Sequence, residues 1–252
     1  MFVINRGSFL TSSIDFFKNR IIDTKTGVDN VCEMFHNAYK HYATKLRASI
    51  DDELRNGNLQ DYGNPVYYTY LIMDGTKLQE MLKIYSIFTI TNKNIDDFCG
   101  NVLYGGKGKS LRKFEHAIFG KLICTKQIDL KKISAKFSKI SQIWERGHGI
   151  TILQLSSDCS HHEAHSREYA IIKSLGLNNI TNVVNGTRYG DMRFWNENEV
   201  SNFGKIMLYN ALVMCVMEPP RIIYMNDVVL PKQKTSSKDW ELQGILECFL
   251  DL

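Results

Sequence analysis

The stretch Tyr104-Gly-Gly-Lys-Gly-Lys-Ser-Leu-Arg-Lys-Phe-Glu-His116 decides how the rest of the chain is interpreted. The apolar residues 102–103 before it are typical of the end of a strand. Its three glycines favour a tight backbone turn that approaches a ligand closely. Ser110 is a suitable N-cap for a following helix, on which Arg112 and His116 share one face because they are four residues apart. A tyrosine, a cationic turn, a guanidinium and an imidazole at one place favour a phosphate ligand.

Two common phosphate-binding motifs are excluded by residue identity. A P-loop requires a glycine five positions before the glycine of its Gly-Lys-Ser sequence, and Leu103 stands there. The dinucleotide-binding fingerprint requires a third glycine where this chain has Leu111. The phosphate must therefore belong to a different kind of site.

Composition indicates an ordinary globular protein. The chain has 252 residues, of which 44% are hydrophobic and 23% charged, and this length is sufficient for one large domain. No uninterrupted apolar run reaches the length of a membrane span, and the first residues do not resemble a secretory signal. Six scattered cysteines without a Cys-x-x-Cys pair favour free thiols in a reducing compartment. We expect an intracellular protein, nuclear or cytoplasmic, that is not secreted and has no membrane partner.

Positive charge is concentrated around the glycine stretch. Residues 101–150 contain eleven lysines and arginines against three acids, a net charge of +8, whereas the whole chain carries +4. Such a concentration is typical of a surface that binds a polyanion, although a solvated lysine face has the same composition. We expect DNA as the partner, contacted by Lys107, Lys109, Lys113, Lys131, Lys132 and Lys136.

The order of the remaining patterns predicts a mixed fold. An aromatic and aliphatic run at 65–73 is typical of a strand in which Tyr68 and Tyr70 share a face. From this segment alone, simple strand packing is the better explanation of these two tyrosines. Further strands are expected at 102–104 and 149–155, and 75–100 reads as an amphipathic patch followed by a polar loop. Helices are expected at 31–54, 110–121, 131–144, 163–175, 200–216 and 240–250.

These elements predict an α/β fold of the α+β type, with a small, mainly antiparallel three-stranded sheet flanked by helices. Residues 1–63 are expected to form an N-terminal helical extension and residues 64–196 the core. Residues 197–252 are expected to form a C-terminal helical extension packed on that core. No internal repeat is visible.

Residues 159–165 contain a candidate zinc cluster. Cys159, His161, His162 and His165 are all zinc-ligand types, but structural zinc sites usually combine two well-spaced ligand pairs, and no second pair lies nearby. Glu163 and Glu168 favour the beginning of a helix at this point. A zinc-dependent structural protein remains the alternative to a helix here.

The chemistry-bearing residues, taken in order, resemble the GIY-YIG nuclease superfamily. Tyr68-Thr-Tyr70 stands at the position of the first motif, and Tyr104-Gly-Gly106 at that of the second, with glycine in its middle position. Glu163-Ala-His-Ser-Arg-Glu168 and Asn182 stand at the family's glutamate helix and terminal asparagine. The similarity covers about residues 64–185. Within the superfamily the chain looks most like the animal ankyrin-repeat and LEM-domain endonucleases that cut branched DNA.

The resemblance implies a DNA endonuclease that uses one Mg²⁺ or Mn²⁺ and prefers branched or junction DNA. It assigns Tyr70 and Tyr104 to orienting and deprotonating the nucleophile, without deciding which does which. Arg112 would neutralise phosphoryl charge, and His116 would relay or position a proton.

On the metal side, the resemblance assigns Glu168 to hold the ion and Asn182 to fix the geometry of the adjacent loop. Glu163, which lies earlier on the same helix, is expected to point to solvent or to the helix N-terminus. A catalytically inactive module of the same fold that binds branched DNA is the alternative function.

Overall fold

The computed structural model describes residues 28–63, 66–85, 90, 92–126 and 134–230. Its centre is a three-stranded antiparallel sheet in the order β2-β1-β3. The strands are β1 (Tyr67–Asp74), β2 (Val102–Lys109) and β3 (Ile150–Cys159). This arrangement confirms the predicted small antiparallel sheet flanked by helices. The predicted helix at 240–250, together with Lys131 and Lys132, lies outside the described residues.

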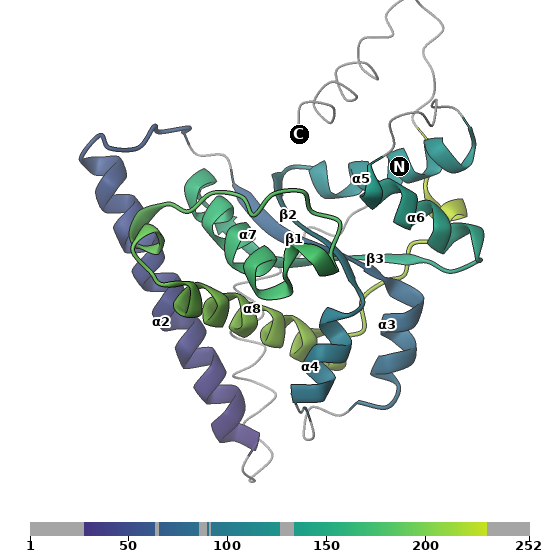
Figure 1. Ribbon diagram of the computed structural model, residues 1–252, viewed down its shortest axis with the longest axis horizontal. Coiled ribbons are helices and arrows are strands. Elements are labelled where there is room, and N and C mark those ends of the chain that lie inside the picture. Colours follow the sequence, from purple (N-terminus) through teal and green to yellow (C-terminus); the bar gives the residue numbers. More distant parts are fainter. Residues whose placement is uncertain (1–27, 64–65, 86–89, 91, 127–133, 231–252) are drawn as a thin grey trace, which may run out of the picture.

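Seven α-helices surround the sheet in the described part of the chain (Figure 1). Helices α5 and α6 contact each other, and helices α2, α7 and α8 form a second group. Short 3-10 turns lie between and after the last helices. The α-helices are α2 (Val28–Arg55), α3 (Gly75–Leu82), α4 (Asn92–Cys99), α5 (Arg112–Cys124), α6 (Ala135–Glu145), α7 (His161–Leu175) and α8 (Glu197–Met217). The 3-10 turns are η3 (Leu177–Asn179), η4 (Gly190–Arg193) and η5 (Met225–Asp227).

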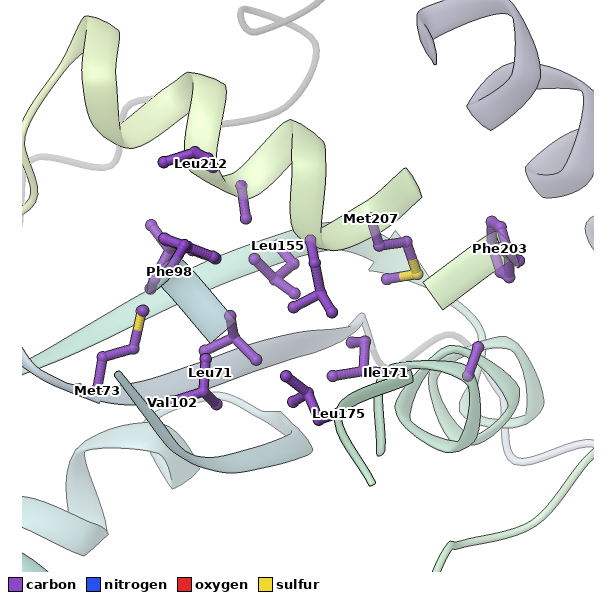
Figure 2. Close-up of a cluster of buried hydrophobic side chains, with 14 of the residues drawn as sticks. Leu71, Met73, Phe98, Val102, Leu155, Ile171, Leu175, Phe203, Met207 and Leu212 are labelled. Atoms are coloured by element: carbon purple, nitrogen blue, oxygen red, sulfur yellow. The ribbon is translucent and has the colours of Figure 1, made fainter. Parts of the chain in front are cut away.

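The alternation of side chains along β1 builds two hydrophobic clusters. Tyr68, Tyr70 and Ile72 belong to the cluster that contains the apolar faces of α5 and α6. Leu71 and Met73 belong to the larger cluster, which also includes buried residues of α4, α7 and α8. Figure 2 shows this larger cluster between the sheet and α8. Tyr68 and Tyr70 therefore share a face, as predicted.

Helix α2 belongs to the larger cluster. Leu46 and Ile50 are fully buried there, and the Tyr42 ring packs edge-on against Trp195 at 5.2 Å between centroids. Gly57, with a φ of +71°, follows the end of the helix, which lies one residue beyond the predicted end at residue 54. The predicted N-terminal extension thus contributes side chains to the same core as the sheet.

Helix α8 is a core element. Its 21 residues are long and apolar enough to cross a membrane by length and composition, but 61% of the apolar window is buried inside the fold. Gly204 packs directly against α7, because a Cβ at this position would lie 2.1 Å from the Ala170 carbonyl oxygen. The buried apolar surface of the helix is thus covered by its own chain.

Three local expectations were wrong. The glycine stretch does not turn, because β2 continues through Lys109 and Gly106 pairs with Tyr70 of β1. Ser110 has a φ of +53° and is not the N-cap; helix α5 begins two residues later. The segment expected to be a polar loop before β2 contains helix α4, whose Phe98 is fully buried.

Candidate active site

Strand β1 and helix α5 bring Tyr70 and His116 together. The Tyr70 hydroxyl lies 2.6 Å from His116 Nε2, and each residue is 1% exposed. Burial, followed by the nearby Tyr104, raises the pKa of Tyr70 well above its usual value. Burial also lowers the pKa of His116 well below its usual value, with Lys136 and Arg112 adding to the effect. Both groups are therefore neutral at physiological pH.

Strand β2 places Tyr104 beside this pair. The Tyr104 ring centroid lies 5.4 Å from that of His116 and 6.3 Å from that of Tyr70. Unlike Tyr70, Tyr104 is partly exposed, so a substrate can reach it. Burial and the charge of Glu168 raise the pKa of Tyr104, and Arg112 opposes that rise. Its hydroxyl is protonated in the resting protein.

Two glycines of β2 allow close packing on opposite faces of the strand. A Cβ at Gly106 would lie 2.6 Å from Tyr104 Cε1 and 2.8 Å from the Tyr70 hydroxyl oxygen. A Cβ at Gly105 would point the other way and lie 3.1 Å from Ile171 of α7. The glycines are thus needed for close approach within the protein, which explains why they occur in a strand.

Helix α5 is held by a tyrosine in place of a conventional cap. The Tyr68 hydroxyl accepts a hydrogen bond from the Lys113 amide (3.1 Å) and donates one to the Ser110 carbonyl (3.0 Å). The start of the helix in turn positions Arg112 close to β2. A Cβ added at Gly108 would lie only 2.8 Å from the Arg112 Cβ. The Arg112 guanidinium also bonds Glu115 at 3.4 Å.

Helix α7 supplies the carboxylate of the site. Glu168 is 7% exposed, and its Oε2 lies 3.3 Å from Lys107 Nζ on β2. Burial raises the pKa of Glu168, although Lys107 and Lys136 oppose the shift. The loop that contains Gly186 lies against the same carboxylate. A Cβ added at Gly186 would lie 3.5 Å from Glu168 Oε2.

Asn182 joins the loop after α7 to β2. Its Oδ1 accepts from the Gly105 amide at 3.0 Å and its Nδ2 donates to the Gly105 carbonyl at 2.7 Å. The preceding Thr181 amide bonds the Leu103 carbonyl at 2.7 Å. The loop therefore pairs with the outer edge of β2 on both sides of Tyr104.

Helix α6 adds a residue whose place the sequence did not indicate. We expected Lys136 to contact DNA, but its side chain is buried, with 9% exposure, and its Nζ lies 4.1 Å from the Tyr104 ring centroid. Lys136, Ile140 and Ile143 recur at helical spacing on the buried face. That spacing is the one signal in the sequence from which its burial could have been predicted.

The comparison with known families rests on the same region. A family model described as the LEM-3-like GIY-YIG domain matches residues 67–229, which include every site residue above. The chain belongs to this family. A GIY-YIG nuclease domain implies an endonuclease and a DNA substrate, and the family typically uses a divalent metal ion.

The curated relatives are longer proteins. The chain is 29% identical over 156 residues to the "Ankyrin repeat and LEM domain-containing protein 1 homolog" of Caenorhabditis elegans, covering 62% of this chain and 21% of the relative. It is 27% identical over 163 residues to the "Ankyrin repeat and LEM domain-containing protein 1" of Mus musculus, covering 64% and 30%. The Homo sapiens protein of that name is 27% identical over 165 residues, covering 64% and 26%. The chain thus spans less than a third of each relative, and no solved structure gives a significant match.

The site has one suitable ligand for the divalent metal that GIY-YIG nucleases use. Among the described residues, no group of three or more histidine, cysteine, aspartate or glutamate side chains could hold an ion. A hard dication such as Mg²⁺, however, is often bound by one or two carboxylates together with waters and substrate phosphates. Glu168 already pairs with a cation, the Lys107 ammonium group. The donor set therefore fits an ion that is completed by the DNA phosphate.

The expectation for Glu163 was wrong. This carboxylate is 1% exposed and lies between two arginines, 2.7 Å from Arg167 and 3.1 Å from Arg47 of α2. Arg167 is also buried and bonds the Tyr39 hydroxyl. Buried carboxylates require such partners, so Glu163 joins α7 to α2 and does not face solvent.

The zinc alternative is not supported in the described residues, because Cys159 and the three histidines form no group of three or more side chains that could hold an ion. Ser160 caps α7 by accepting from the Glu163 amide, so the histidines form the first turns of a helix. His161 and His165 contact each other through their Nε2 atoms at 3.1 Å, and Tyr62 packs on His161 at 4.3 Å between centroids. Cys159 is a free, buried thiol.

The remaining predicted DNA contacts are lysines near the site. Lys109 at the end of β2 is exposed, and Lys107 and Lys113 are partly buried. Lys113 extends toward the sheet, where its ammonium group bonds Gln154. Their contact with DNA stays a prediction.

Proposed function

We propose that this GIY-YIG domain is a Mg²⁺- or Mn²⁺-dependent endonuclease that hydrolyses phosphodiester bonds in branched DNA. The observation that carries the proposal is the convergence of Tyr104, the Tyr70–His116 pair, Arg112 and the Glu168 carboxylate. Hydrolysis requires a group that removes a proton from water, positive charge for the phosphoryl oxygens, and help for the leaving oxygen. Each requirement has a candidate at this place.

Tyr104 is the better candidate for the base. It is partly exposed, whereas Tyr70 is buried and bonded to His116, so the attacking water can approach Tyr104 more easily. Tyrosine can accept the proton of the water only after its own hydroxyl has ionised to phenolate. Nearby cations favour this ionised form. The Tyr70–His116 pair then orients Tyr104 and the water from behind. Arg112 offers its guanidinium to the phosphoryl oxygens, where negative charge increases in the transition state.

Glu168 would hold the metal ion, which acts as a Lewis acid on the scissile phosphate when bound. Binding requires Lys107 to leave the carboxylate, and the DNA phosphate offers that ammonium a new partner. Asn182 keeps the backbone of Gly105 fixed, and with it the neighbouring Tyr104. The preference for branched DNA rests on the resemblance to the animal endonucleases and on the dense basic charge of residues 101–150.

The test is cleavage of labelled DNA under single-turnover conditions. The protein is incubated with Mg²⁺ or Mn²⁺ and either linear duplex or a four-way junction of the same sequence, with EDTA and Glu168→Gln as controls. We expect metal-dependent cuts near the branch of the junction and little cutting of the duplex. Binding of the junction without cuts in either metal would favour the alternative, an inactive branched-DNA-binding module. Equal cutting of both substrates would contradict the preference for branches.

A further inference from the structure

Lys136 occupies an unusual position for a lysine. It lies in the first turn of α6, next to the exposed N-terminal residue Ala135, and yet its side chain is turned inward and is 9% exposed. Its Nζ lies 4.1 Å from the centroid of the Tyr104 ring and 5.0 Å from that of Phe137. By contrast, Lys139 on the same helix is exposed. The protein thus directs one lysine of α6 at the candidate base.

The surroundings oppose a positive charge on Lys136. Burial and the like charge of Arg112 lower its pKa to about 8, and Glu168 opposes the shift. The N-terminus of a helix also disfavours a cation. Perturbed charges of this kind cluster at functional sites. The position of this charge beside Tyr104 therefore points to a role in the reaction.

We propose that Lys136 is a positioning residue of the nuclease reaction, which acts by stabilising the phenolate form of Tyr104. The inference rests on the proposed function, in which Tyr104 is the base. In the reaction, the Tyr104 phenolate takes a proton from the attacking water as the new oxygen–phosphorus bond forms. The bond from phosphorus to the leaving sugar oxygen then breaks, and its electron pair stays on that oxygen, which takes a proton from solvent water. Tyr104 later returns its proton to the solvent, so the atoms balance as hydrolysis by one water and no oxidant is required.

The ring face is the right place for such a cation. A neutral phenol ring attracts a cation weakly through its quadrupole. When the hydroxyl loses its proton, part of the negative charge spreads into the ring, so the same ammonium group is attracted much more strongly. Lys136 therefore favours phenolate over phenol, whereas a neutral side chain there would not discriminate.

Among the described residues, the ionisable groups that face this pair come from three elements. Glu168 of α7 bears the negative charge that opposes the phenolate, and Arg112 of α5 bears a positive charge. His116 of α5 and Tyr70 of β1 are neutral over the relevant pH range, because burial lowers the pKa of His116 and raises that of Tyr70. Lys136 and Tyr104 are thus the pair whose shared proton changes near neutral to mildly alkaline pH.

The coupling predicts a particular pH profile. The reactive arrangement, Lys136 charged and Tyr104 ionised, contains one proton less than the resting arrangement. Its population rises tenfold per pH unit until the pair loses its first proton, close to the Lys136 pKa of about 8, and is then constant. The single-turnover rate, measured at saturating DNA and metal ion, should therefore show a break near this pH.

Three variants test the profile: Lys136→Met, Lys136→Arg and, as the matched control on the exposed face, Lys139→Met. Lys136→Met should reduce the rate at neutral pH by about ten- to a hundredfold, and the rate of this variant should rise with pH without the break. Lys136→Arg should keep most of the rate and move the break upward, since a guanidinium titrates above about 12. Lys139→Met should match the unmodified protein. An unchanged break in Lys136→Met, or a loss confined to DNA affinity, would overturn the proposal and make Lys136 a phosphate contact.

A second measurement does not depend on cleavage. Tetranitromethane nitrates a tyrosine through its phenolate form, so the rate of Tyr104 nitration at pH 7 reports the phenolate population while Lys136 is still charged. The rate is followed by mass spectrometry in the absence of DNA and metal ion, with Tyr104→Phe to identify the signal. Lys136→Met should slow the nitration of Tyr104 about tenfold or more relative to Lys139→Met. Circular dichroism and the melting temperature identify a variant that fails to fold, for which Lys136→Gln is substituted. An unchanged nitration rate refutes the inference even if the protein cuts DNA, and a slower one supports it even if the proposed cleavage fails.

Discussion

Tyr70 and His116 form a buried pair, with 2.6 Å between the phenol oxygen and Nε2. Neither side chain has access to bulk water, and the pair lies directly behind the more exposed Tyr104. Two groups that bond each other in this way act as one unit. Their separate removal and their joint removal should consequently have similar effects on the reaction.

Tyr70→Phe and His116→Gln should each reduce the single-turnover rate by about 10² or more, because either change removes the hydrogen bond that positions the pair. The double variant should be no slower than the slower single variant. A double-mutant cycle on the cleavage rate measures this coupling. Tyr85→Phe, which changes a tyrosine in the segment after α3 that bonds Asp97, serves as the control. Additive losses would show that the two residues act separately.

The two glutamates of α7 should separate activity from stability. Glu168→Gln removes the charge that a hard dication requires, so cleavage should be lost while DNA binding persists or tightens. Glu163→Gln should instead destabilise the fold by about 3–5 kcal/mol, because it leaves the buried Arg167 without its carboxylate. Denaturant unfolding and single-turnover cleavage of both variants measure the two effects. Cleavage that survives in Glu168→Gln at full rate would contradict the metal assignment.

The ionised side chain of Glu168 should also lower the stability of the folded protein at neutral pH. Burial raises the pKa of this carboxyl, so the folded protein binds the proton more tightly than the unfolded chain does. The ionised form is then penalised in the fold above the unfolded pKa, and the penalty disappears as the pH falls through the raised folded pKa. Glu168→Gln should melt at a higher temperature than the unmodified protein at pH 7, with a difference that shrinks toward acid. A Glu168→Gln protein that melts at a lower temperature than the unmodified protein at pH 7 would mean that Lys107 outweighs the burial.

Gly106→Ala should disable the site without unfolding the protein. The added methyl group would lie 2.6 Å from Tyr104 and 2.8 Å from the Tyr70 hydroxyl, so the two rings must separate. We expect a rate loss on the order of 10² with a smaller effect on DNA affinity. Gly100→Ala is the matched control, since its nearest neighbours are carbonyl oxygens at 3.5 Å. Equal activities of the two variants would show that the spacing of the tyrosines is not critical.

Arg112→Ala should reduce the cleavage rate by about 10² or more, because the charge that increases on the phosphoryl oxygens loses its partner. DNA affinity, measured by fluorescence anisotropy, should change much less. Arg146→Ala, at the exposed end of α6, controls for the loss of one positive charge. If affinity falls as far as the rate does, Arg112 is an anchor for phosphate and has no special role in the transition state.

Local sequence patterns predicted the sheet and most helices because strand and helix periodicities are short-range properties. The contact of His116 with Tyr70 was partly predictable too, since the helix that carries His116 follows directly on the neighbouring strand. The glycines of β2 were misread as a turn. Each of these glycines is required by a neighbour from another element: Gly106 by the rings of Tyr104 and Tyr70, Gly105 by Ile171 and Gly108 by Arg112. No property of the local sequence contains that information.

Glu163 and Lys136 were misplaced for a related reason. A charged residue is normally assigned to the surface, and the partners that allow its burial come from distant segments. Arg47 of α2 lies 116 residues from Glu163 in sequence, and Tyr104 lies on a different element from Lys136. Positions of buried charge therefore depend on the assembled fold, whereas the identity of the motif residues does not.

The burial of Leu46 and Ile50 determines where a working fragment of this protein can begin. The family model matches from Tyr67, beyond the end of α2, so a fragment cut at that boundary would lose both side chains and expose the face of α8 that they cover. It would also remove Arg47 and leave the carboxylate of Glu163 with a single cation. The smallest unit that folds thus begins upstream of the unit that sequence comparison recognises, and preparations intended for crystallisation or enzymology should retain α2.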